Sequence, residues 1–397
     1  MERSTTRAML YGALAGLAVT LWPSAGVAQD TIKIGVILPY SGQFADLAAQ
    51  LDNGIKLYMK THGDTVAGKK IVVIRKDVGG IAPDVAKRLA QELVVRDGVD
   101  ILAGFIATPN AMAASDVSDQ AKKFMVLMNA GTSIVTTKSQ YSVRTSFTMA
   151  QVADAFGTWA ARNGIKRTYT MVSDYAPGHD AESLYARAFK AGGGEIVGSV
   201  RMPVNNPDFS PFVQRMKDAA PDSAFVFVPG GAQPPAFGKS LNERGIDPRR
   251  IKIMGTGEIA DETAVKAMGD AALGIMSAWH YDHNLPSATN QAFVKAYRAE
   301  FKRSPDFVSV GGYDGMHLTY ETLKKTKGNT DGDALIAAAK GMAWESPRGP
   351  ISIDPATRNI VQTIYIREVR KVDGEYQNVT IGKIENVKDI ILEGMKK

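Results

Sequence analysis

The stretch Thr31–Lys60 reads TIKIGVILPYSGQFADLAAQLDNGIKLYMK and decides the fold class. Residues 32–38 are apolar and rich in β-branched side chains, which predicts a buried strand that stops at Pro39. A turn follows, and apolar residues then recur on one helical face over 47–59. Strand, loop and helix form the first half of a βαβ unit. Ligands of parallel sheets lie beyond the carboxyl ends of the strands, so the loop with Ser41 is the first piece of a predicted binding site.

Length and composition limit the possible classes of protein. The chain has 397 residues, which is long for one hydrophobic core, so two lobes are expected. The net charge of +6 comes from 47 basic and 41 acidic residues scattered along the chain, which does not indicate a nucleic-acid partner. The chain has no cysteine, which excludes disulfides, thiol catalysis and cysteine metal sites.

The N-terminus resembles a secretory signal. Arg3 and Arg7 precede an apolar run over 8–22, and small residues follow at 26–28. The run of about 15 residues is shorter than the roughly 20 that a bilayer span needs, so an uncleaved anchor is the less favoured alternative. We predict a cleavable signal peptide over 1–28 and export to the periplasm as a soluble protein.

The strand–helix alternation continues and then restarts near residue 148. Strands are predicted at 32–38, 71–74, 101–104 and 124–128, and then at 168–172, 196–201, 224–228 and 251–254. After Trp279 the pattern changes to three helices, two strands and a weak C-terminal tail of short strands over 376–391. The fold class predicted is α/β, with two similar Rossmann-like lobes.

The usual enzyme signatures are absent from the sequence. It contains no phosphate loop ending in Gly-Lys-Ser/Thr and no Gly-x-Ser-x-Gly nucleophile turn. The glycines at 192–194 lie between a helix and a strand, where they indicate a helix end. His280 and His283 have no accompanying carboxylate set, so a surface loop is favoured over a metal site. We therefore expect no enzymatic activity, no metal and no cofactor.

Hydroxyl side chains at strand ends remain as candidate ligand groups. Thr108 followed by Pro109 predicts a helix start, and unpaired N–H groups there favour a carboxylate. Thr132 and Ser133 lie on the next strand loop and are able to share that carboxylate. Glu258, in the other half, is placed to meet an ammonium or hydroxyl group across a cleft. The alternatives are a plain helix cap for Thr108 and a solvated acid for Glu258.

These segments together resemble a known family. The matching segments are the signal, 32–42, 104–108, 130–132, 174–178, 255–258 and 313–314. Each is weak alone, but their order and spacing are similar to the branched-chain amino-acid (Leu/Ile/Val) binding proteins of ABC transporters. That family has the type I periplasmic-binding fold, two lobes joined by a three-crossover hinge. The resemblance implies one lobe over 31–147 plus 279–353 and a second over 148–278 plus 354–397.

The resemblance also implies a function and a set of site residues. Thr108, with Ala130, Gly131 and Thr132 on the neighbouring loop, would hold the ligand carboxylate, and Glu258 would meet an α-ammonium. Phe105 is either an aromatic wall of the site or part of the lobe core. The protein would be a monomer that delivers a small carboxylated ligand to an ABC permease.

One position departs from the family pattern and leaves the ligand open. The family often has an aromatic residue immediately before Gly178, but here that residue is Pro177 and the aromatic is Tyr175. The predicted ligand is therefore a branched-chain or related amino acid, and the alternative ligands are an aromatic carboxylate or a small amide. A ligand sensor with the same fold is a further alternative to transport.

Overall fold

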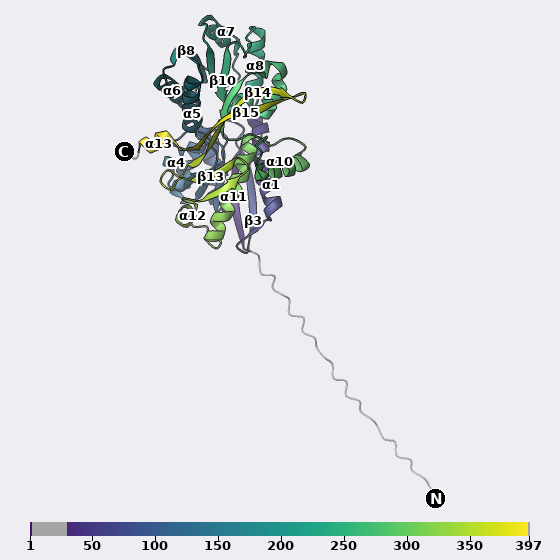
Figure 1. Ribbon diagram of the computed structural model, residues 1–397. Coiled ribbons are helices and arrows are strands. Elements are labelled where there is room, and N and C mark those ends of the chain that lie inside the picture. Colours follow the sequence, from purple (N-terminus) through teal and green to yellow (C-terminus); the bar gives the residue numbers. More distant parts are fainter. Residues whose placement is uncertain (2–29, 396–397) are drawn as a thin grey trace.

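Two mixed sheets with mainly parallel central strands, each covered by helices, form the molecule (Figure 1). The computed structural model describes Met1 and residues 30–395, so the predicted signal peptide lies, apart from Met1, outside the described residues. The first sheet has the order β2-β3-β1-β4-β5-β6, and the second has the order β12-β13-β14-β11-β10-β9-β7-β8, with β15 paired to β14. This confirms the predicted α/β class.

The part built on the first sheet is called lobe 1. Its first elements are β1 (Thr31–Leu38), η1 (Gly42–Phe44), α1 (Ala45–His62), β2 (Thr65–Val66), β3 (Lys69–Asp77), α2 (Pro83–Val95), β4 (Ile101–Gly104), α3 (Thr108–Gln120), β5 (Phe124–Leu127), α4 (Val135–Lys138) and β6 (Ser142–Arg144). Helices α10 (Ala288–Phe301), α11 (Phe307–Lys325) and α12 (Gly332–Ala339) return to this lobe.

The part built on β7–β11 is called lobe 2. Its elements are α5 (Met149–Arg162), β7 (Arg167–Ser173), α6 (Ala176–Ala191), β8 (Glu195–Met202), α7 (Ser210–Asp218), β9 (Ser223–Phe227), α8 (Gln233–Glu243), β10 (Lys252–Thr256), η2 (Gly257–Ala260), α9 (Glu262–Met268), η3 (Gly269–Ala272) and β11 (Met276–Trp279). The C-terminal elements are β12 (Ala343–Ser346), β13 (Gly349–Ile353), β14 (Ile360–Val372), β15 (Glu375–Val387) and α13 (Ile390–Gly394).

The period of two along β1 divides the core of lobe 1. Ile34, Val36 and Leu38 face the cluster that includes α1 and α11, whereas Ile37 faces the cluster beneath α2 and α3. Helices α1 and α11 approach closely because of glycine, since a Cβ added at Gly54 would lie 2.0 Å from the Ser309 carbonyl oxygen. The hydrophobic pattern of 31–60 thus buries β1 in lobe 1 and fixes where its carboxyl end lies.

The C-terminal region differs from the prediction of short strands. Residues 375–387 form one strand of 13 residues, antiparallel to β14 with two register irregularities. Such irregularities interrupt the alternation of exposed and buried residues, and this hides the strand in the sequence. The hairpin β14–β15 runs between the two lobes (Figure 1). Strands β12 and β13 were expected in lobe 1. They instead join the second sheet, because β13 pairs with β14.

A buried ion pair fixes the region where the chain crosses between the sheets. Arg348 and Asp314 lie 2.9 Å apart, and their side chains are 0% and 1% exposed. Arg348 also donates to the carbonyl oxygen of Ser146 and to the side chain of Gln362, at 2.7 and 2.8 Å. One guanidinium therefore ties three segments together at the hinge.

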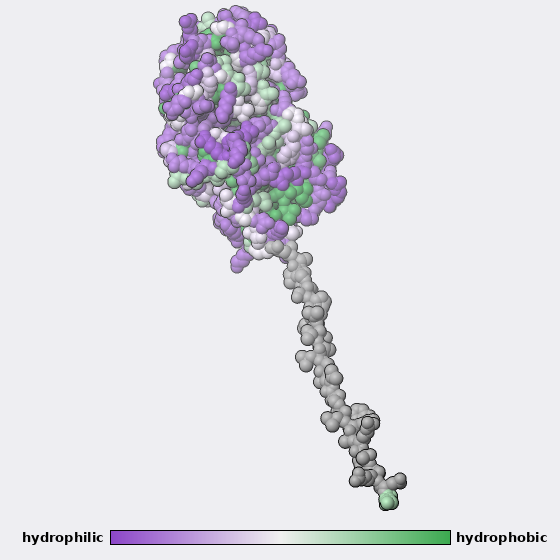
Figure 2. Space-filling model, turned by 90° about the vertical axis from the view of Figure 1, so that its right-hand side faces the viewer, coloured by the Kyte–Doolittle hydropathy of each residue, from purple (hydrophilic) through white to green (hydrophobic). Residues whose placement is uncertain are grey.

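Most of the visible surface is hydrophilic, and hydrophobic side chains gather in small areas (Figure 2). In the part of the chain that the structure describes, no helix has the length and hydropathy that a bilayer span requires.

Candidate functional site

The loops at the carboxyl ends of the strands of both lobes face each other. In lobe 1 they follow β1, β4 and β5, and in lobe 2 they follow β7, β9 and β10. The lobes touch at the rim of this cleft, because a Cβ added at Gly231 would lie 2.7 Å from the carbonyl oxygen of Gln43. The structure therefore shows a closed arrangement of the lobes.

The lobe 1 wall brings together the residues that were predicted to hold a carboxylate. The Thr132 N–H donates to the Thr108 hydroxyl at 3.4 Å, and the Ala130 N–H donates to the Phe105 carbonyl oxygen at 3.0 Å. Gly131 accepts from the Met149 N–H at 2.8 Å. Within residues 30–395, the buried hydroxyl of Ser133 has no hydrogen-bond partner, whereas the Thr132 hydroxyl lies beside the Asp180 carboxyl of α6 and lowers its pKa against the effect of burial. The Ser133 hydroxyl is therefore free to bind a ligand.

Thr108 has a different local role from the predicted helix cap. Helix α3 begins at Thr108, and the preceding Ala107 occupies the cap position. Pro109 has no N–H to be capped, and the Thr108 hydroxyl turns to the Thr132 N–H instead. The helix start thus connects two strand loops.

The side chain of Phe105 belongs to the core of lobe 1, and Ser41 lies on the loop after β1. The Phe105 side chain is 1% exposed and belongs to the core beneath α2 and α3, with a φ of 69° that turns the chain after β4. Ser41 is exposed, and its N–H donates to Asp77 at 3.3 Å. Phe105 therefore shapes the site through its backbone.

The lobe 2 wall carries a buried carboxyl group. Glu258 lies in the short helix η2 and is 6% exposed, and burial raises its pKa from 4.5 to about 8 despite the nearby Thr256 hydroxyl. Its Oε2 atom has no hydrogen-bond partner within the described chain. Tyr175 lies nearby. Burial raises the pKa of its phenol, and the charge of Glu258 raises it further. Glu258 is therefore protonated near neutral pH, and it is not a solvated acid.

Four aromatic rings, those of Phe147, Trp279, His280 and Phe307, pack together beside the two walls, and we call this cluster the aromatic floor. All four are 0–4% exposed, and none was predicted as a site residue. Phe147 and Trp279 have ring centroids 4.5 Å apart, and Phe147 stacks on His280 at 5.1 Å. Phe307 contacts Trp279 edge-on at 5.0 Å. A Cβ added at Gly131 would lie 2.8 Å from Phe147, and one added at Gly257 would lie 2.0 Å from Trp279. The floor therefore adjoins both walls. Trp279 ends β11 and His280 follows it, and this position at a strand end is the signal that could have revealed the two residues.

The two histidines are not in a surface loop, and that prediction was wrong. His280 is 0% exposed and His283 is 8% exposed. His280 is enclosed by aromatic rings, whereas His283 lies 3.1 Å from Glu262. The loop after β11 crosses the interior of the hinge, and its sequence alone does not reveal this burial. Among the described residues, no group of three or more side chains is arranged to hold a metal ion.

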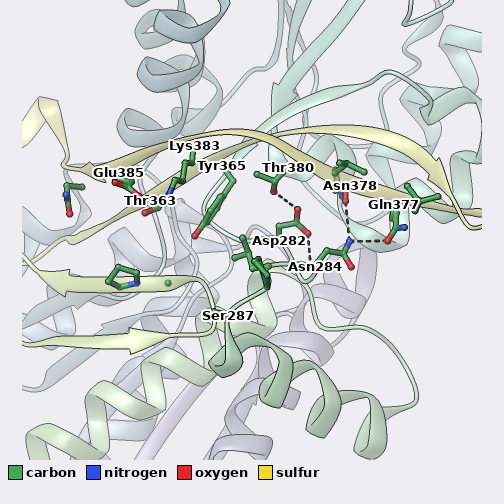
Figure 3. A pocket seen from close by; sticks show the side chains of 17 residues that line it. Asp282, Asn284, Ser287, Thr363, Tyr365, Gln377, Asn378, Thr380, Lys383 and Glu385 are labelled. Atoms are coloured by element: carbon green, nitrogen blue, oxygen red, sulfur yellow. Dashed lines mark hydrogen bonds and ion pairs between the residues drawn. The ribbon is translucent and has the colours of Figure 1, made fainter.

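A separate pocket of about 1060 Å³ lies at the hinge (Figure 3). It is bounded by the loop 282–287, the turn at Gly349 and the hairpin β14–β15. Its polar groups largely bind one another, since Asp282 accepts from Thr380 at 2.7 Å and Asn284 donates to Gln377 at 3.1 Å. No predicted site residue lines this pocket, which is distinct from the cleft between the walls.

Comparison with known proteins gives the family. A family model described as periplasmic binding protein matches residues 31–375. The Leu/Ile/Val-binding protein homolog 6 of Brucella melitensis biotype 1 is 42% identical over 380 residues, which cover 95% of this chain and 97% of the relative.

Two solved structures are similar along almost their whole length. A solute-binding protein of an ABC transporter from Rhodopseudomonas palustris BisB5, in complex with 3,4-dihydroxybenzoic acid, is 57% identical with a TM-score of 0.88 and coverage of 91% and 99%. A second, from Rhodopseudomonas palustris HaA2 in complex with p-hydroxybenzoic acid, is 40% identical with a TM-score of 0.89 and coverage of 92% and 100%. The chain therefore belongs to the periplasmic binding proteins, with the type I fold, and is a substrate-binding protein of an ABC transporter.

Proposed function

We propose that this protein closes on an aromatic carboxylate of the hydroxybenzoate class and delivers it to an ABC permease. The observation that carries the proposal is the floor of Phe147, Trp279, His280 and Phe307 between two walls with free hydrogen-bonding groups. A flat apolar ring fits such a floor, and the hydroxyls of Thr132 and Ser133 suit its carboxylate. The hydroxybenzoates bound by the 57% and 40% identical proteins support this class.

The protonation state of Glu258 supports the same class. With a pKa of about 8, the buried carboxyl is neutral at pH 7, when it can donate and accept hydrogen bonds. An amino-acid ligand brings an ammonium group, which favours the ionised carboxylate. Binding of an amino acid would therefore force Glu258 to release a proton, whereas a hydroxybenzoate would not.

A branched-chain amino acid is the second candidate. It is favoured by the position of Glu258 opposite Thr108 and Thr132, and by the name of the 42% identical relative. We further propose that the exported protein acts as a monomer without catalysing a reaction, after removal of residues 1–28.

Calorimetric titration with leucine, valine, benzoate and hydroxybenzoates tests the proposal. Each titration is run at pH 7 in two buffers of different ionisation enthalpy, so that the number of protons released is measured with the affinity. Binding of hydroxybenzoates with little proton release is expected. Binding of leucine alone, with release of close to one proton, would replace the aromatic acid by an amino acid and would retain the transport role.

A further inference from the structure

We propose that His280 is a specificity-determining residue, which recognises the ring hydroxyl group of the ligand at the floor of the cleft. This inference rests on the proposed function, because it requires an aromatic carboxylate in the cleft. It assigns a task to a side chain that the family resemblance did not select.

The position of His280 leaves it few other roles. The residue follows β11 directly, and its imidazole is held between rings, stacked on Phe147 at an interplanar angle of 14° and edge-on to Phe307 at 86°. The faces of the imidazole are thus taken up by packing, and its edge carries the two nitrogens. The side chain is 0% exposed, so water from the bulk does not solvate that edge.

The hydrogen-bonding capacity of His280 is not fully used. The backbone of Phe307 lies near enough to His280 to act on its pKa as a hydrogen-bond partner, but no hydrogen bond of ordinary geometry reaches Nδ1 or Nε2 within residues 30–395, and the same is true of the neighbouring Trp279 Nε1. Buried polar atoms without partners are rare in proteins, because each has lost its hydrogen bonds to water. Two such side chains in succession, in a floor that adjoins both walls, indicate a ligand group that binds there.

The charge state of the His280 imidazole determines which kind of ligand group it can bind. Burial and the nearby guanidinium groups of Arg348 and Arg367 lower its pKa well below 6.5, and the backbone of Phe307 opposes this only weakly. A neutral imidazole has one donor and one acceptor, and the indole N–H of Trp279 adds a donor. A hydroxyl group both donates and accepts, so it can donate to the imidazole and accept from the indole. A ligand carboxylate only accepts and is better served by the hydroxyls of Thr132 and Ser133.

The test compares ligands that differ in one hydroxyl. The dissociation constants of benzoate, 4-hydroxybenzoate, 3-hydroxybenzoate and 4-methoxybenzoate are measured for the wild type, His280→Phe and His280→Gln. His280→Phe keeps a ring of similar size but removes both nitrogens, whereas His280→Gln keeps a donor and an acceptor. The matched control is His317→Phe, because His317 stacks on Trp344 at 5.1 Å in lobe 1, outside the cleft.

The expected result is a loss of preference rather than a general loss of binding. His280→Phe should bind benzoate as the wild type does, with its preference for one hydroxybenzoate over benzoate reduced by about ten- to hundredfold. His280→Gln should retain part of the preference, and His317→Phe should retain all of it. An equal weakening of every ligand in His280→Phe would show a packing role and overturn the inference.

A measurement on the wild type keeps the inference testable if the variants fail to fold. The chain has five histidines, so the imidazole ¹⁵N signals can be assigned individually. The signals of His280 should shift on adding a hydroxybenzoate and change much less on adding benzoate. The same shift with both ligands would overturn the inference and leave the proposed function intact. Failure of every benzoate to bind the wild type would instead refute the proposed function.

Discussion

The guanidinium of Arg303 in lobe 1 donates a hydrogen bond to the hydroxyl of Thr263 in lobe 2, at 2.9 Å. Arg303 is held in place by Asp46, whose carboxylate lies 2.7 Å away and also lies 3.5 Å from the Thr263 hydroxyl. This contact joins the two lobes at the rim of the cleft and requires them to be closed.

Removing the Thr263 hydroxyl should weaken ligand binding without touching the ligand. A Thr263→Val variant disfavours only the closed state, so the apparent affinity should fall about two- to fivefold, as expected for an exposed charged contact of about 0.4–1 kcal/mol. Calorimetry with the best ligand measures the change. Thr137→Val is the control, because this exposed hydroxyl bonds only within lobe 1. An unchanged affinity in Thr263→Val would show that the contact does not contribute to closure.

Glu258 should make the unfolding free energy depend on pH. Its pKa is raised from 4.5 to about 8, so the native state holds a proton that the unfolded chain has lost. Stability should therefore fall as the pH rises from about 4.5 to 8, by up to about 1.36 kcal/mol per pH unit. Glu258→Gln should lack this contribution, and urea unfolding between pH 5 and 9 measures the difference between the two proteins.

The raised pKa of Asp306, about 6, affects both proteins and cancels in that difference. Burial and then charge repulsion by Asp261, whose own pKa is about 7, raise the pKa of Glu258, so the difference reports the coupled pair of Glu258 and Asp261. The control is Asp247→Asn, because Arg249 holds the pKa of the Asp247 carboxyl at about 2, below the window. If the free energy of unfolding of the wild type and of Glu258→Gln changed with pH in the same way, the raised pKa of Glu258 would be contradicted.

Breaking the buried ion pair at the hinge should be costly. Asp314→Ala leaves the fully buried Arg348 guanidinium without its counter-charge, and unfolding measured in urea should show a loss of about 3–5 kcal/mol. The double variant Asp314→Leu, Arg348→Met should recover much of this loss, because no charge then remains buried. Asp373→Asn is the control: it changes an exposed carboxylate at a φ of 50°, which asparagine tolerates. A loss below about 1 kcal/mol in Asp314→Ala would mean that water reaches Arg348.

The contact between η2 and the aromatic floor should be sensitive to a single methyl group. A Cβ at Gly257 would lie 2.0 Å from the Trp279 ring, so Gly257→Ala must displace the ring or the loop that carries Glu258. We expect a stability loss of about 1–3 kcal/mol and weakened ligand binding, measured by thermal unfolding and calorimetry. Gly80→Ala is the matched control, because no described atom lies within 4 Å of its added Cβ. Ligand binding at the wild-type level in Gly257→Ala would place the site away from Trp279.

The sequence alone determined the architecture and one part of the candidate site. The pattern of apolar residues identified the long strands of both sheets, because buried faces require residues spaced by two in strands and by three or four in helices. The short strands β2, β6, β11 and β12 were not predicted. Strand ends follow from these elements, so Thr108, Thr132 and Glu258 were found as residues of facing loops. The sequence pattern predicts a helix over 313–326, but α11 begins six residues earlier at Phe307, because Gly311 and Gly312 obscure the helical pattern after the Asp306 cap.

Only the tertiary structure decided what surrounds those residues. Phe147, Trp279, His280 and Phe307 come from three separated segments, and their stacking depends on how the chain crosses between the lobes. The burial of His280 and the pKa of Glu258 also arise from neighbours distant in the sequence. Local patterns determine which face of a strand or helix is buried, whereas desolvation depends on what packs against that face. The sequence therefore predicted a cleft for a carboxylate, and the folded chain added a buried aromatic cluster beside it.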